Sequence, residues 1–590
     1  MTEPILGIDL GTTNSVAAVF ENGKVRVLPN QEGDRVTPSI VAFKGREVLV
    51  GSGARRQAAS NPELTFHSVK RWIGRPYEDV AEEAEPYPYT VVRGPRGMPR
   101  MRAPSGLVSA EEISAHVLRR LRAAAEASSG GNIRQAVITV PANFNDRQRQ
   151  ATRDAGRLAG FDVRRIISEP TAAVLAYGID RQDDSLVLAY DFGGGTFDVS
   201  ILEIRAGTVQ VLSTAGDPRL GGDEIDMRIA DWLVSVFERS HGVAPANDPG
   251  VRVRLLEAAE QAKITLSSAL EADIRVPFLP GADGQPHNLE HSLTRTRLEA
   301  MIQELVDATM QACQRALTDA KLRPHDVQDV LLVGGSSRIP AVRRAIERLT
   351  GKEPRDAIAP DEIVAMGAAV QGGILTGQVQ NLSFRDVLPL SLGIQTAHGS
   401  FTRVVPRNTQ IPTRVTRTFS TARDNQKNVG LHLLQGERSQ AAENTSLGQF
   451  VLRNLPDLPR GVPRVEVTFD VDADGILHVS AREATTGQGK RVAVRSQTGL
   501  KEAEIQKILT EAASHRDQDE RAERLAEARN LVDGVLLELE SALATPTLSK
   551  ERKEALEPLA TLAQDVMNEE DPELLKTAAD EVLRVLRPKR

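Results

Sequence analysis

The chain has 590 residues, of which 40% are hydrophobic and 26% charged, and its formal net charge is −7. A chain of this length exceeds what one hydrophobic core organises, so its composition predicts several soluble domains. The acidic balance argues against nucleic acid as a partner, because phosphate backbones are bound by basic surfaces. Cys313 is the single cysteine, which excludes an intramolecular disulfide and indicates a reducing compartment.

The N-terminal segment has no basic stretch followed by an apolar one, as a secretory signal has. The sequence also has no apolar run long enough to span a membrane. We therefore expect a cytoplasmic protein without a membrane partner. Cys313 lies in a helical pattern, which predicts a buried thiol rather than a reactive one.

Residues 1–380 mix short β-rich runs with helical stretches, a pattern typical of an α/β fold. Strands are predicted at residues 5–10, 135–140, 186–191, 199–204 and 330–333. Helices are predicted at residues 110–127, 146–159, 250–267 and 294–320.

The pattern changes to strands and turns between residues 388 and 497. The segment VEVTFDVDADGILHVSA alternates apolar and polar residues and predicts a hairpin with Asp474 and Gly475 at its bend. Beyond Gly499, Ala, Glu, Leu, Lys and Arg recur with helical periodicity and predict three helices. Ser549 and Asp571 are expected to cap two of them, the latter followed by Pro572.

Two segments of the α/β part resemble each other. ILGIDLGTTNSVAAVF and LVLAYDFGGGTFDVSILEI each contain an apolar strand ending in Asp, a Gly/Thr turn and a second apolar strand. Such turns direct backbone N–H groups to one side, where they bind phosphate oxygens. Asp9 and Asp191 hold equivalent places and suit Mg²⁺, which is bound through few protein ligands and several waters. We therefore expect two related lobes that enclose a nucleotide.

A third glycine turn, LLVGGSSR at residues 331–338, follows an apolar strand and precedes a helix. This setting favours an anion or an adenosine contact. The sequence has neither a G-x-x-x-x-G-K-[ST] loop nor a G-x-G-x-x-G motif, so it does not predict a P-loop or a dinucleotide fold.

The successive motifs GIDLGTTNS, ITVPANFND, ISEPTAA, DFGGGTFD, GDPRLGGDEID and LLVGGSSRIP resemble those of the DnaK-type chaperones, the seventy-kilodalton heat-shock family. The similarity extends from Ile5 to about Arg495. It implies an α/β actin-like two-lobed nucleotide-binding domain, an antiparallel β-sandwich and a C-terminal α-helical lid. It also implies an ATPase whose nucleotide, ATP or ADP with Mg²⁺, controls the binding of extended apolar segments of unfolded proteins.

The resemblance assigns roles in ATP hydrolysis. It implies that phosphates are held by the two turns, at Gly11, Thr12, Thr13, Gly193, Gly194, Gly195 and Thr196. It implies that hydrated Mg²⁺ is positioned by Asp9 and Asp191, and that Lys70 reaches the γ-phosphate and its attacking water. Glu169 and Asp198 are implied to order that water or the metal shell. Thr196, together with Asp9, Lys70, Glu169, Asp191 and Asp198, is expected to be catalytic. Adenosine is expected to contact Glu260, Lys263, Ser267, Gly334, Gly335, Ser336, Arg338 and Asp361.

The resemblance also assigns the other half of the molecule. It implies that a peptide side chain enters a pocket formed by Ile394, Phe419, Val429 and Leu431, closed by the arch residues Ala397 and Ala422. From periodicity alone such residues cannot be separated from core, because alternating apolar residues usually line a sandwich interior. Pro141, Arg149, Arg165 and Asp386 are expected to transmit the nucleotide state, and Arg165 to receive a J-domain co-chaperone.

These patterns divide the chain into residues 1–380 for nucleotide binding, 381–388 as linker, 389–498 for peptide binding and 499–590 as lid. The expected partners are client peptides, a J-domain co-chaperone and a nucleotide exchange factor, and the chain is expected to be monomeric. In the linker, Ser383 and Arg385 stand where relatives carry leucines, while Asp386 is kept. Loss of apolar burial predicts weaker docking of this segment on the nucleotide domain.

Two alternatives remain at this point. Repeated phosphate turns also fit an actin-fold sugar or acetate kinase, although a kinase leaves the β-sandwich and the lid without a role. The altered linker also fits a specialised relative that serves as exchange factor or as dedicated partner of one signalling protein.

Overall fold

The computed structural model describes residues 3–45, 47–179, 183–355, 359–396, 399–421, 423–459, 461–484 and 492–495. Of the C-terminal segment it describes residues 524, 525, 528, 529, 531, 532, 535, 536, 539, 542, 543, 550–567, 569 and 571–586.

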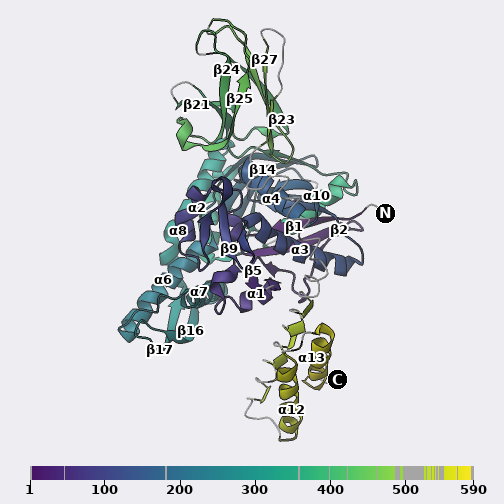
Figure 1. Ribbon diagram of the computed structural model, residues 1–590, viewed down its shortest axis with the longest axis vertical. Helices are drawn as coiled ribbons and strands as arrows, with labels where there is room; N and C mark the ends of the chain where they lie inside the picture. The colour runs from purple at the N-terminus through teal and green to yellow at the C-terminus, as the bar shows by residue number, and fades with distance from the viewer. Residues whose placement is uncertain are drawn as a thin grey trace.

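Two mixed sheets of related topology form the centre of the molecule (Figure 1). The first contains β1 (Ile5–Leu10), β2 (Asn14–Glu21), β3 (Lys24–Leu28), β11 (Gln135–Val140) and β12 (Asp162–Ser168), in the order β12-β11-β1-β2-β3, with the short β4 (Thr37–Pro38) paired to β2. The second contains β13 (Ser185–Phe192), β14 (Phe197–Arg205), β15 (Thr208–Asp217) and β18 (Asp329–Val333), in the order β18-β13-β14-β15. In both, the first strand pairs antiparallel with its hairpin partner and parallel with a later strand.

We call residues 3–168 the first lobe and residues 185–355 the second lobe. Two helices, α5 (Glu169–Gly178) and α10 (Ile363–Leu375), lie between the sheets and share one apolar core with both. They approach closely, because a Cβ at Gly367 would lie 1.6 Å from the carbonyl oxygen of Ala172. Glycine is therefore required at this crossing. The shared core fixes the two sheets around one central seam.

Each lobe has a further core on the outer side of its sheet. In the first lobe α3 (Ala110–Ser129) and α4 (Asp146–Leu158) pack with the small sheet of β5 (Val41–Lys44), β6 (Glu47–Val50) and β7 (Thr65–Phe66). In the second lobe α6 (Gly222–His241), α7 (Pro249–Ser268), α8 (Arg295–Asp319) and α9 (Pro340–Thr350) pack with the hairpin of β16 (Glu271–Pro280) and β17 (Pro286–Thr294). Smaller elements of the first lobe are α1 (Ser52–Arg56), α2 (Tyr77–Ala84), β8 (Val91–Arg93), β9 (Pro99–Ala103) and β10 (Gly106–Val108).

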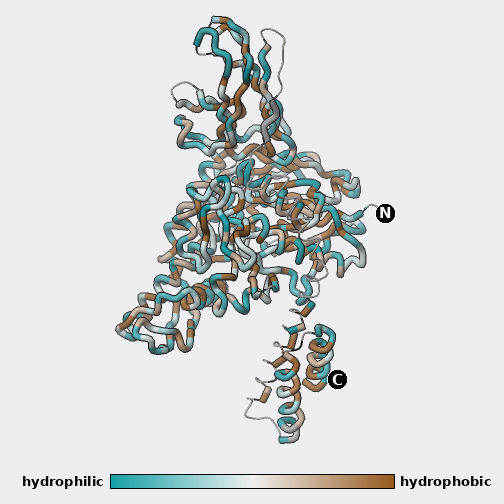
Figure 2. The backbone as a smooth tube through the Cα atoms, in the orientation of Figure 1, coloured by the Kyte–Doolittle hydropathy of each residue, from teal (hydrophilic) through white to brown (hydrophobic). Residues whose placement is uncertain are grey.

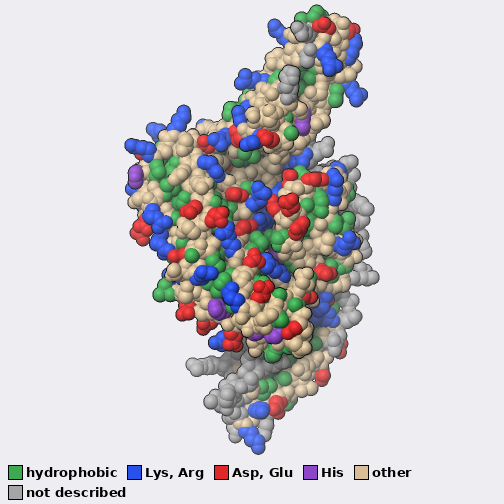
Figure 3. Space-filling view, turned by 90° about the vertical axis from the view of Figure 1, so that its left-hand side faces the viewer, with side chains coloured by type: hydrophobic (Ala, Val, Ile, Leu, Met, Phe, Trp, Pro, Cys, Tyr) green, Lys and Arg blue, Asp and Glu red, His purple; other side chains and the backbone are tan. Residues whose placement is uncertain are grey.

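The five predicted strands and four predicted helices of this part are all present, with ends shifted by a few residues at most. Cys313 is fully buried in α8, and burial raises the pKa of its thiol, as expected for a packing residue. On the face shown in Figure 3, basic and acidic side chains are interspersed.

A sandwich of two four-stranded antiparallel sheets stands at one end of the molecule (Figure 1). One sheet orders β20 (Leu392–Gln395), β21 (Phe401–Val405), β24 (Asn428–Gln435) and β25 (Thr445–Arg453) as β21-β20-β24-β25. The other orders β23 (Thr413–Phe419), β26 (Val465–Val471), β27 (Leu477–Glu483) and β28 (Val492–Arg495) in sequence. Figure 2 shows hydrophobic residues along these strands, and alternate residues of β26 and β27 are buried, which confirms the predicted hairpin.

The linker forms a strand of the second central sheet. β19 (Ser383–Val387) pairs parallel with β15 and antiparallel with β22 (Gln410–Ile411). Ser383 and Arg385 are exposed, whereas Leu382 and Asp386 are buried and Phe384 is half-buried. The expectation that Ser383 and Arg385 weaken docking by removing apolar burial is wrong. Successive side chains of a strand point to opposite faces, and these two face solvent.

Two C-terminal helices, α12 (Lys550–Val566) and α13 (Pro572–Leu586), share an apolar core with residues between 525 and 543. The Asp571 carboxylate accepts a hydrogen bond from the Glu573 backbone N–H at 3.0 Å, which confirms its expected cap. Ser549 lies outside the described residues. The bundle lies beside the small sheet of the first lobe, where Arg529 pairs with Glu47 at 3.3 Å (Figure 1). Among the described residues, every helix falls short of the length and apolarity that crossing a membrane requires.

Candidate nucleotide site and interdomain contacts

The two repeated turns meet face to face between the lobes. A Cβ at Gly194 would lie 1.8 Å from Thr13 Oγ1, and a Cβ at Gly195 would lie 2.5 Å from Thr12 Cγ2. Glycine is therefore the residue that lets the second turn approach the first. Thr13 Oγ1 is buried and has no hydrogen-bond partner among the described residues, which marks it as a contact for a ligand.

A pocket at these turns collects the predicted phosphate and catalytic residues. Its lining includes Asp9, Gly11, Thr12, Thr13, Lys70, Glu169, Asp191, Gly193, Gly194 and Thr196. Asp198 lies directly across the hairpin from Asp191 in the β13–β14 register. The strand ends position the carboxylates, whereas Lys70 comes from a 3₁₀ turn and Glu169 from the first residue of α5.

Buried carboxylates dominate the electrostatics of this pocket. Lys70 Nζ donates to Glu169 Oε1 at 2.5 Å, and both side chains are at most 10% exposed. Burial and the Glu169 charge raise the pKa of Asp9 to about 7 and that of Asp198 to about 8, and they raise the pKa of Asp191 as well. One lysine does not balance four carboxylates, so the site favours additional positive charge.

These residues fit a divalent cation. Asp198 Oδ2 is buried without a hydrogen-bond partner among the described residues, and hard carboxylate oxygens are the ligands that Mg²⁺ prefers. Thr139 and Asn143, which the sequence analysis did not single out as site residues, support the cluster. The Thr139 hydroxyl donates to Asp9 at 3.2 Å, and the Asn143 backbone N–H donates to Asp198 at 3.2 Å.

A second pocket of the same cleft collects the predicted adenosine contacts. Its lining includes Glu260, Lys263, Ser267, Gly335, Ser336, Arg338 and Asp361. The third turn closes against the second, since Ser336 Oγ donates to the Gly193 carbonyl at 3.0 Å. Gly334, which lines the phosphate pocket, has φ 76°, and a Cβ there would lie 2.5 Å from the Phe192 carbonyl oxygen. Arg338 pairs with Asp361 at 2.6 Å.

Two further carboxylates of this cleft, those of Asp223 and Asp226, are not among the site residues predicted from the sequence. Lys263 Nζ pairs with Asp226 at 2.6 Å, and Ser68 Oγ donates to Asp223 at 2.8 Å across the lobes. Their spacing of three residues at the start of α6 places both on one helix face, a signal that the sequence offered.

The sandwich contacts the first lobe through the bend of its β26–β27 hairpin. Arg149 Nη1 donates to the Asp474 carbonyl at 3.3 Å, and the Ile166 N–H donates to Asp474 Oδ1 at 3.1 Å. Arg153 pairs with the same carboxylate. Asp474 was expected only to form a turn, and the structure makes it the centre of this contact.

Two more links join the same surfaces. Asp146 accepts a hydrogen bond from the Leu477 N–H at 2.5 Å and its own N–H donates to Gln435 Oε1 at 3.3 Å. Arg407 pairs with Asp319 of the second lobe at 2.7 Å. The sandwich is thus held against both lobes.

Three of the predicted transmitting residues, Arg149, Arg165 and Asp386, lie in or beside the linker strand. Burial raises the pKa of Asp386, and the Arg149 charge opposes this effect. Arg165 Nε lies 3.6 Å from Asp474 Oδ1, and the Arg165 guanidinium lies over the Phe384 ring. Pro141 is buried at the end of β11, where its carbonyl accepts from the Phe144 N–H at 3.1 Å. Nucleotide cleft and sandwich are therefore connected through β11, α4, β12 and β19.

The residues predicted to line a peptide pocket differ in burial. Ile394 and Leu431 are 2% and 3% exposed and belong to the sandwich core, whereas Phe419 and Val429 are half-buried at its margin. The arch residues Ala397 and Ala422 lie outside the described residues. The peptide-binding role of this set stays a prediction.

A central pair of related sheets with facing phosphate turns, joined by a docked strand to a sandwich, is typical of a two-lobed nucleotide-dependent ATPase that acts on a second domain. Residues 5–589 match the family model described as Hsp70 protein. The chain therefore belongs to the Hsp70 family, and it is an ATP-hydrolysing chaperone.

The curated relatives agree with this placement. The chain is 48% identical over 585 residues to proteins named chaperone protein DnaK from two strains of Thermus thermophilus, covering 98% of this chain and 95% of each relative. It is also 48% identical over 558 residues to a protein of that name from Cyanidioschyzon merolae, covering 94% of this chain and 92% of the relative. These names favour the chaperone over the kinase and exchange-factor alternatives.

Proposed function

We propose that ATP in the cleft between the lobes sets the affinity of the sandwich for extended apolar segments of unfolded proteins. The observation that carries this proposal is the linker strand β19, which joins the sheet of the second lobe and leads directly into the sandwich. Such a strand belongs to the sheet of one domain and tethers the next domain. Its pairing with the sheet can form or break with the nucleotide state, so the strand is an element with two stable arrangements.

In this proposal the two turns bind the phosphates of ATP through their backbone N–H groups and the hydroxyls of Thr12, Thr13 and Thr196. Adenosine lies in the neighbouring pocket at Lys263, Ser336 and Arg338. Backbone N–H groups gathered in a tight turn form an anion site without a charged side chain. The lobes close on the ligand because each supplies one of the turns.

Asp9 and Asp191 hold Mg²⁺ through water in this proposal, and the ion neutralises phosphate charge when bound. Lys70 and Glu169 form a buried pair that orients the attacking water, while Asp198 accepts a hydrogen bond from the same water or from the metal shell. Hydrolysis of ATP depends on such positioning and charge stabilisation rather than on a covalent intermediate. Release of phosphate then removes the γ-phosphate from between the two turns, while ADP stays bound.

We propose the division of the chain at residues 1–380, 381–388, 389–498 and 499–590 for nucleotide binding, linker, peptide binding and lid. Further proposals are a cytoplasmic location, a monomer, and two partners besides client peptides: a J-domain co-chaperone that reaches Arg165 and a nucleotide exchange factor. Arg165 is 24% exposed as a side chain and stands beside both the linker and Asp474, so a partner at this position could act on the docked state.

Equilibrium binding of a fluorescent Leu-rich peptide to the full chain tests the proposal. Fluorescence anisotropy is measured with ATP, using the slow hydrolysis variant Thr196→Ala, and with ADP. We expect an affinity at least about tenfold lower with ATP. Equal affinities in the two nucleotides would overturn the proposed control, and the absence of peptide binding in both would overturn the peptide site.

A further inference from the structure

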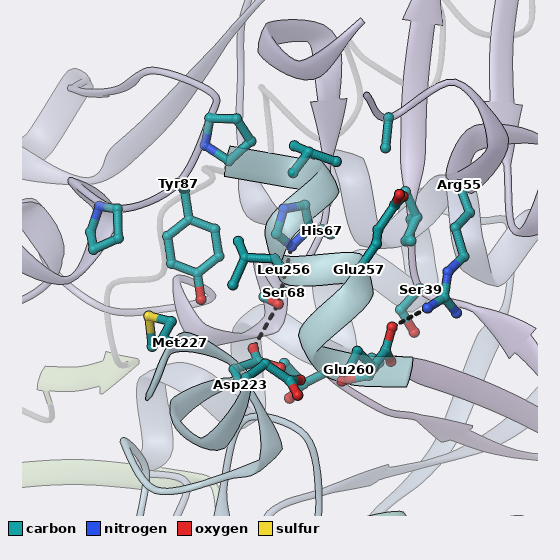
Figure 4. Close-up of a pocket in the computed structure, with 18 residues that line it drawn as sticks. Ser39, Arg55, His67, Ser68, Tyr87, Asp223, Met227, Leu256, Glu257 and Glu260 are labelled. Carbon is teal, nitrogen blue, oxygen red and sulfur yellow. Dashed lines mark hydrogen bonds and ion pairs between the residues drawn. The ribbon is translucent and has the colours of Figure 1, made fainter. Parts of the chain in front are cut away.

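A third cavity opens between the lobes beside the two nucleotide pockets, with a volume of about 130 Å³ (Figure 4). It borders the first phosphate turn at Thr12 and Thr13. Most of the residues that line it have no proposed contact with ATP. The first lobe contributes His67, Ser68 and Tyr87 with their neighbours, and the second lobe contributes Met227, Leu256 and Glu257.

The walls are mainly apolar. They include the Tyr87 ring, two prolines and the side chains of Ile40, Ala58, Met227, Val253 and Leu256. The Tyr87 ring is held edge-on against Trp72, with ring centroids 5.2 Å apart. An aromatic wall that is fixed by a buried neighbour offers a flat, preformed surface to a ligand.

The polar groups of the cavity carry excess negative charge. Four carboxylates line it, those of Asp223, Asp226, Glu257 and Glu260, whereas Arg55 is the one arginine or lysine among the described residues that line it. Arg55 is engaged by Glu260. His67 adds no positive charge near neutral pH, because burial lowers the pKa of its imidazole.

Two of these carboxylates have capacity for a ligand. Asp226 is 9% exposed, and its Oδ1 is buried without a hydrogen-bond partner among the described residues, while its other oxygen binds Lys263. Glu257 is an exposed residue of α7 that lines the cavity, and desolvation of part of its side chain raises the pKa of its carboxyl. A carboxylate in this state is stabilised by a cation that approaches it.

We propose that this cavity is a binding site for a small, flat organic cation, in which the apolar part packs against Tyr87 and Leu256 and the charged group faces Glu257 and Asp226. Anions are disfavoured by the four carboxylates. A bare metal ion would leave the apolar walls without a contact. A protonated amine or amidine on an aromatic or branched frame satisfies both kinds of surface, and the aromatic face of Tyr87 adds a favourable contact to a cation.

A ligand bound in the cavity is expected to oppose separation of the two lobes. Its walls come from both lobes, and two direct contacts, Ser68–Asp223 and Arg55–Glu260, already bridge the lobes at separate points of the cavity lining (Figure 4). A ligand between them adds further bridging contacts that must break before the lobes separate. Bound cation is therefore expected to slow the release of ADP, a consequence that rests on the proposed nucleotide cleft.

Benzamidine is a suitable probe, with benzamide as its neutral analogue and benzoate as its anionic one. Ligand-observed NMR and isothermal titration are carried out on the full chain saturated with ADP and Mg²⁺, so that the nucleotide pockets are filled. We expect saturable benzamidine binding at least about tenfold tighter than that of benzamide, and no binding of benzoate. Equal binding of benzamidine and benzamide, or loss of benzamidine binding when ADP is added, would overturn the proposal.

Variants locate the site. Glu257→Gln removes the charge without changing the shape and is expected to weaken benzamidine at least fivefold, whereas Glu238→Gln, an exposed position on α6 outside the cavity, is expected to leave it unchanged. Leu256→Trp should fill the cavity and abolish binding. An unaltered benzamidine affinity in Glu257→Gln contradicts the site, whether or not Leu256→Trp folds.

Release of a fluorescent ADP analogue measures the consequence separately. In the wild type, saturating benzamidine is expected to slow release at least about threefold, and this effect should be absent in Glu257→Gln at the same benzamidine concentration. If benzamidine binds and release does not change, the bridging part of the proposal is wrong. If ADP itself does not bind, the proposed nucleotide cleft fails while direct benzamidine binding still decides the cavity.

Discussion

The guanidinium carbon of Arg165 lies 5.4 Å from the centre of the Phe384 ring. Phe384 belongs to the linker strand, and Arg165 belongs to β12 of the first lobe and also lies beside Asp474 of the sandwich. Contacts between an arginine and an aromatic face contribute about 0.5–1 kcal/mol when exposed and about 2 kcal/mol when desolvated. One arginine therefore links the two domains and the segment between them.

Phe384→Ala is expected to weaken linker docking, because it removes both the contact to Arg165 and the apolar surface that packs on the central core. A loss of about 1.4 kcal/mol changes the docked-to-undocked ratio about tenfold. The ratio of peptide dissociation rates in ATP and in ADP, measured by stopped flow, should fall by about that factor. An unchanged ratio would show that Phe384 does not hold the docked state.

The double variant Ser383→Leu and Arg385→Leu is the matched control for this prediction. Both side chains face solvent in the docked strand, so added apolar groups gain little burial. We expect the dissociation ratio to remain within about twofold of the wild type. A marked rise in the ratio would mean that the outward face of the strand is buried in the ATP-bound protein.

Asp474→Asn should uncouple the domains. The Asp474 carboxylate pairs with Arg153 and accepts a hydrogen bond from the Ile166 N–H, and loss of its charge leaves the two buried or half-buried arginines, 149 and 153, less well balanced. ATP is expected to accelerate peptide release at least about tenfold less than in the wild type, with peptide affinity in ADP unchanged. Asp470→Asn, on an exposed face of β26, is the control and should behave as the wild type.

Thr196→Ala and Lys70→Ala are expected to slow single-turnover ATP hydrolysis at least tenfold while leaving ATP binding largely intact. Thr196 lines the phosphate pocket, and Lys70 meets Glu169 within it. Groups that act on the γ-phosphate contribute most in the transition state, where charge changes most. Rapid-quench experiments measure the single-turnover hydrolysis rate. Wild-type rates in both variants would contradict the assignment of Thr196 and Lys70 to the γ-phosphate.

The nucleotide-free protein should lose stability as pH rises from about 4 to about 8, through the buried Asp198. Its pKa is about 8 in the folded state because of burial and the Glu169 charge, while the unfolded value is near 3.8. Between these values the folded state binds more protons than the unfolded state, so the free energy of unfolding falls with increasing pH. Chemical denaturation across this range should show a flatter profile for Asp198→Asn than for the wild type. Parallel profiles would contradict this.

Local pattern was sufficient to predict much of the fold. Residues 5–10 and 135–140 are apolar runs bounded by polar or turn residues, and β1 and β11 have the predicted ends. The relation between the two copies is visible in the sequence because the same strand, Asp and turn recur. Their facing contact depends on the glycines at 194 and 195, which the motif already contains.

Long-range contacts were not predictable in the same way. Asp474 looks like an ordinary hairpin residue, and its partners Arg153 and Ile166 stand more than 300 positions away. Val429 and Leu431 belong to one apolar alternation but differ in burial, which depends on how the two sheets stack. The wrong expectation for Ser383 and Arg385 could have been avoided from the local sequence. A strand at the edge of a core buries every second residue, and Leu382, Phe384 and Asp386 already have this spacing.

Hydrogen exchange of the linker amides tests the central claim, that nucleotide state controls the docking of β19. The full-length Thr196→Ala variant is compared with saturating ATP and with ADP, and exchange is followed by mass spectrometry for a peptide that covers Ser383–Val387. We expect strong protection with ATP, because these residues pair with β15, and fast exchange with ADP. Equal protection in the two nucleotides would contradict it.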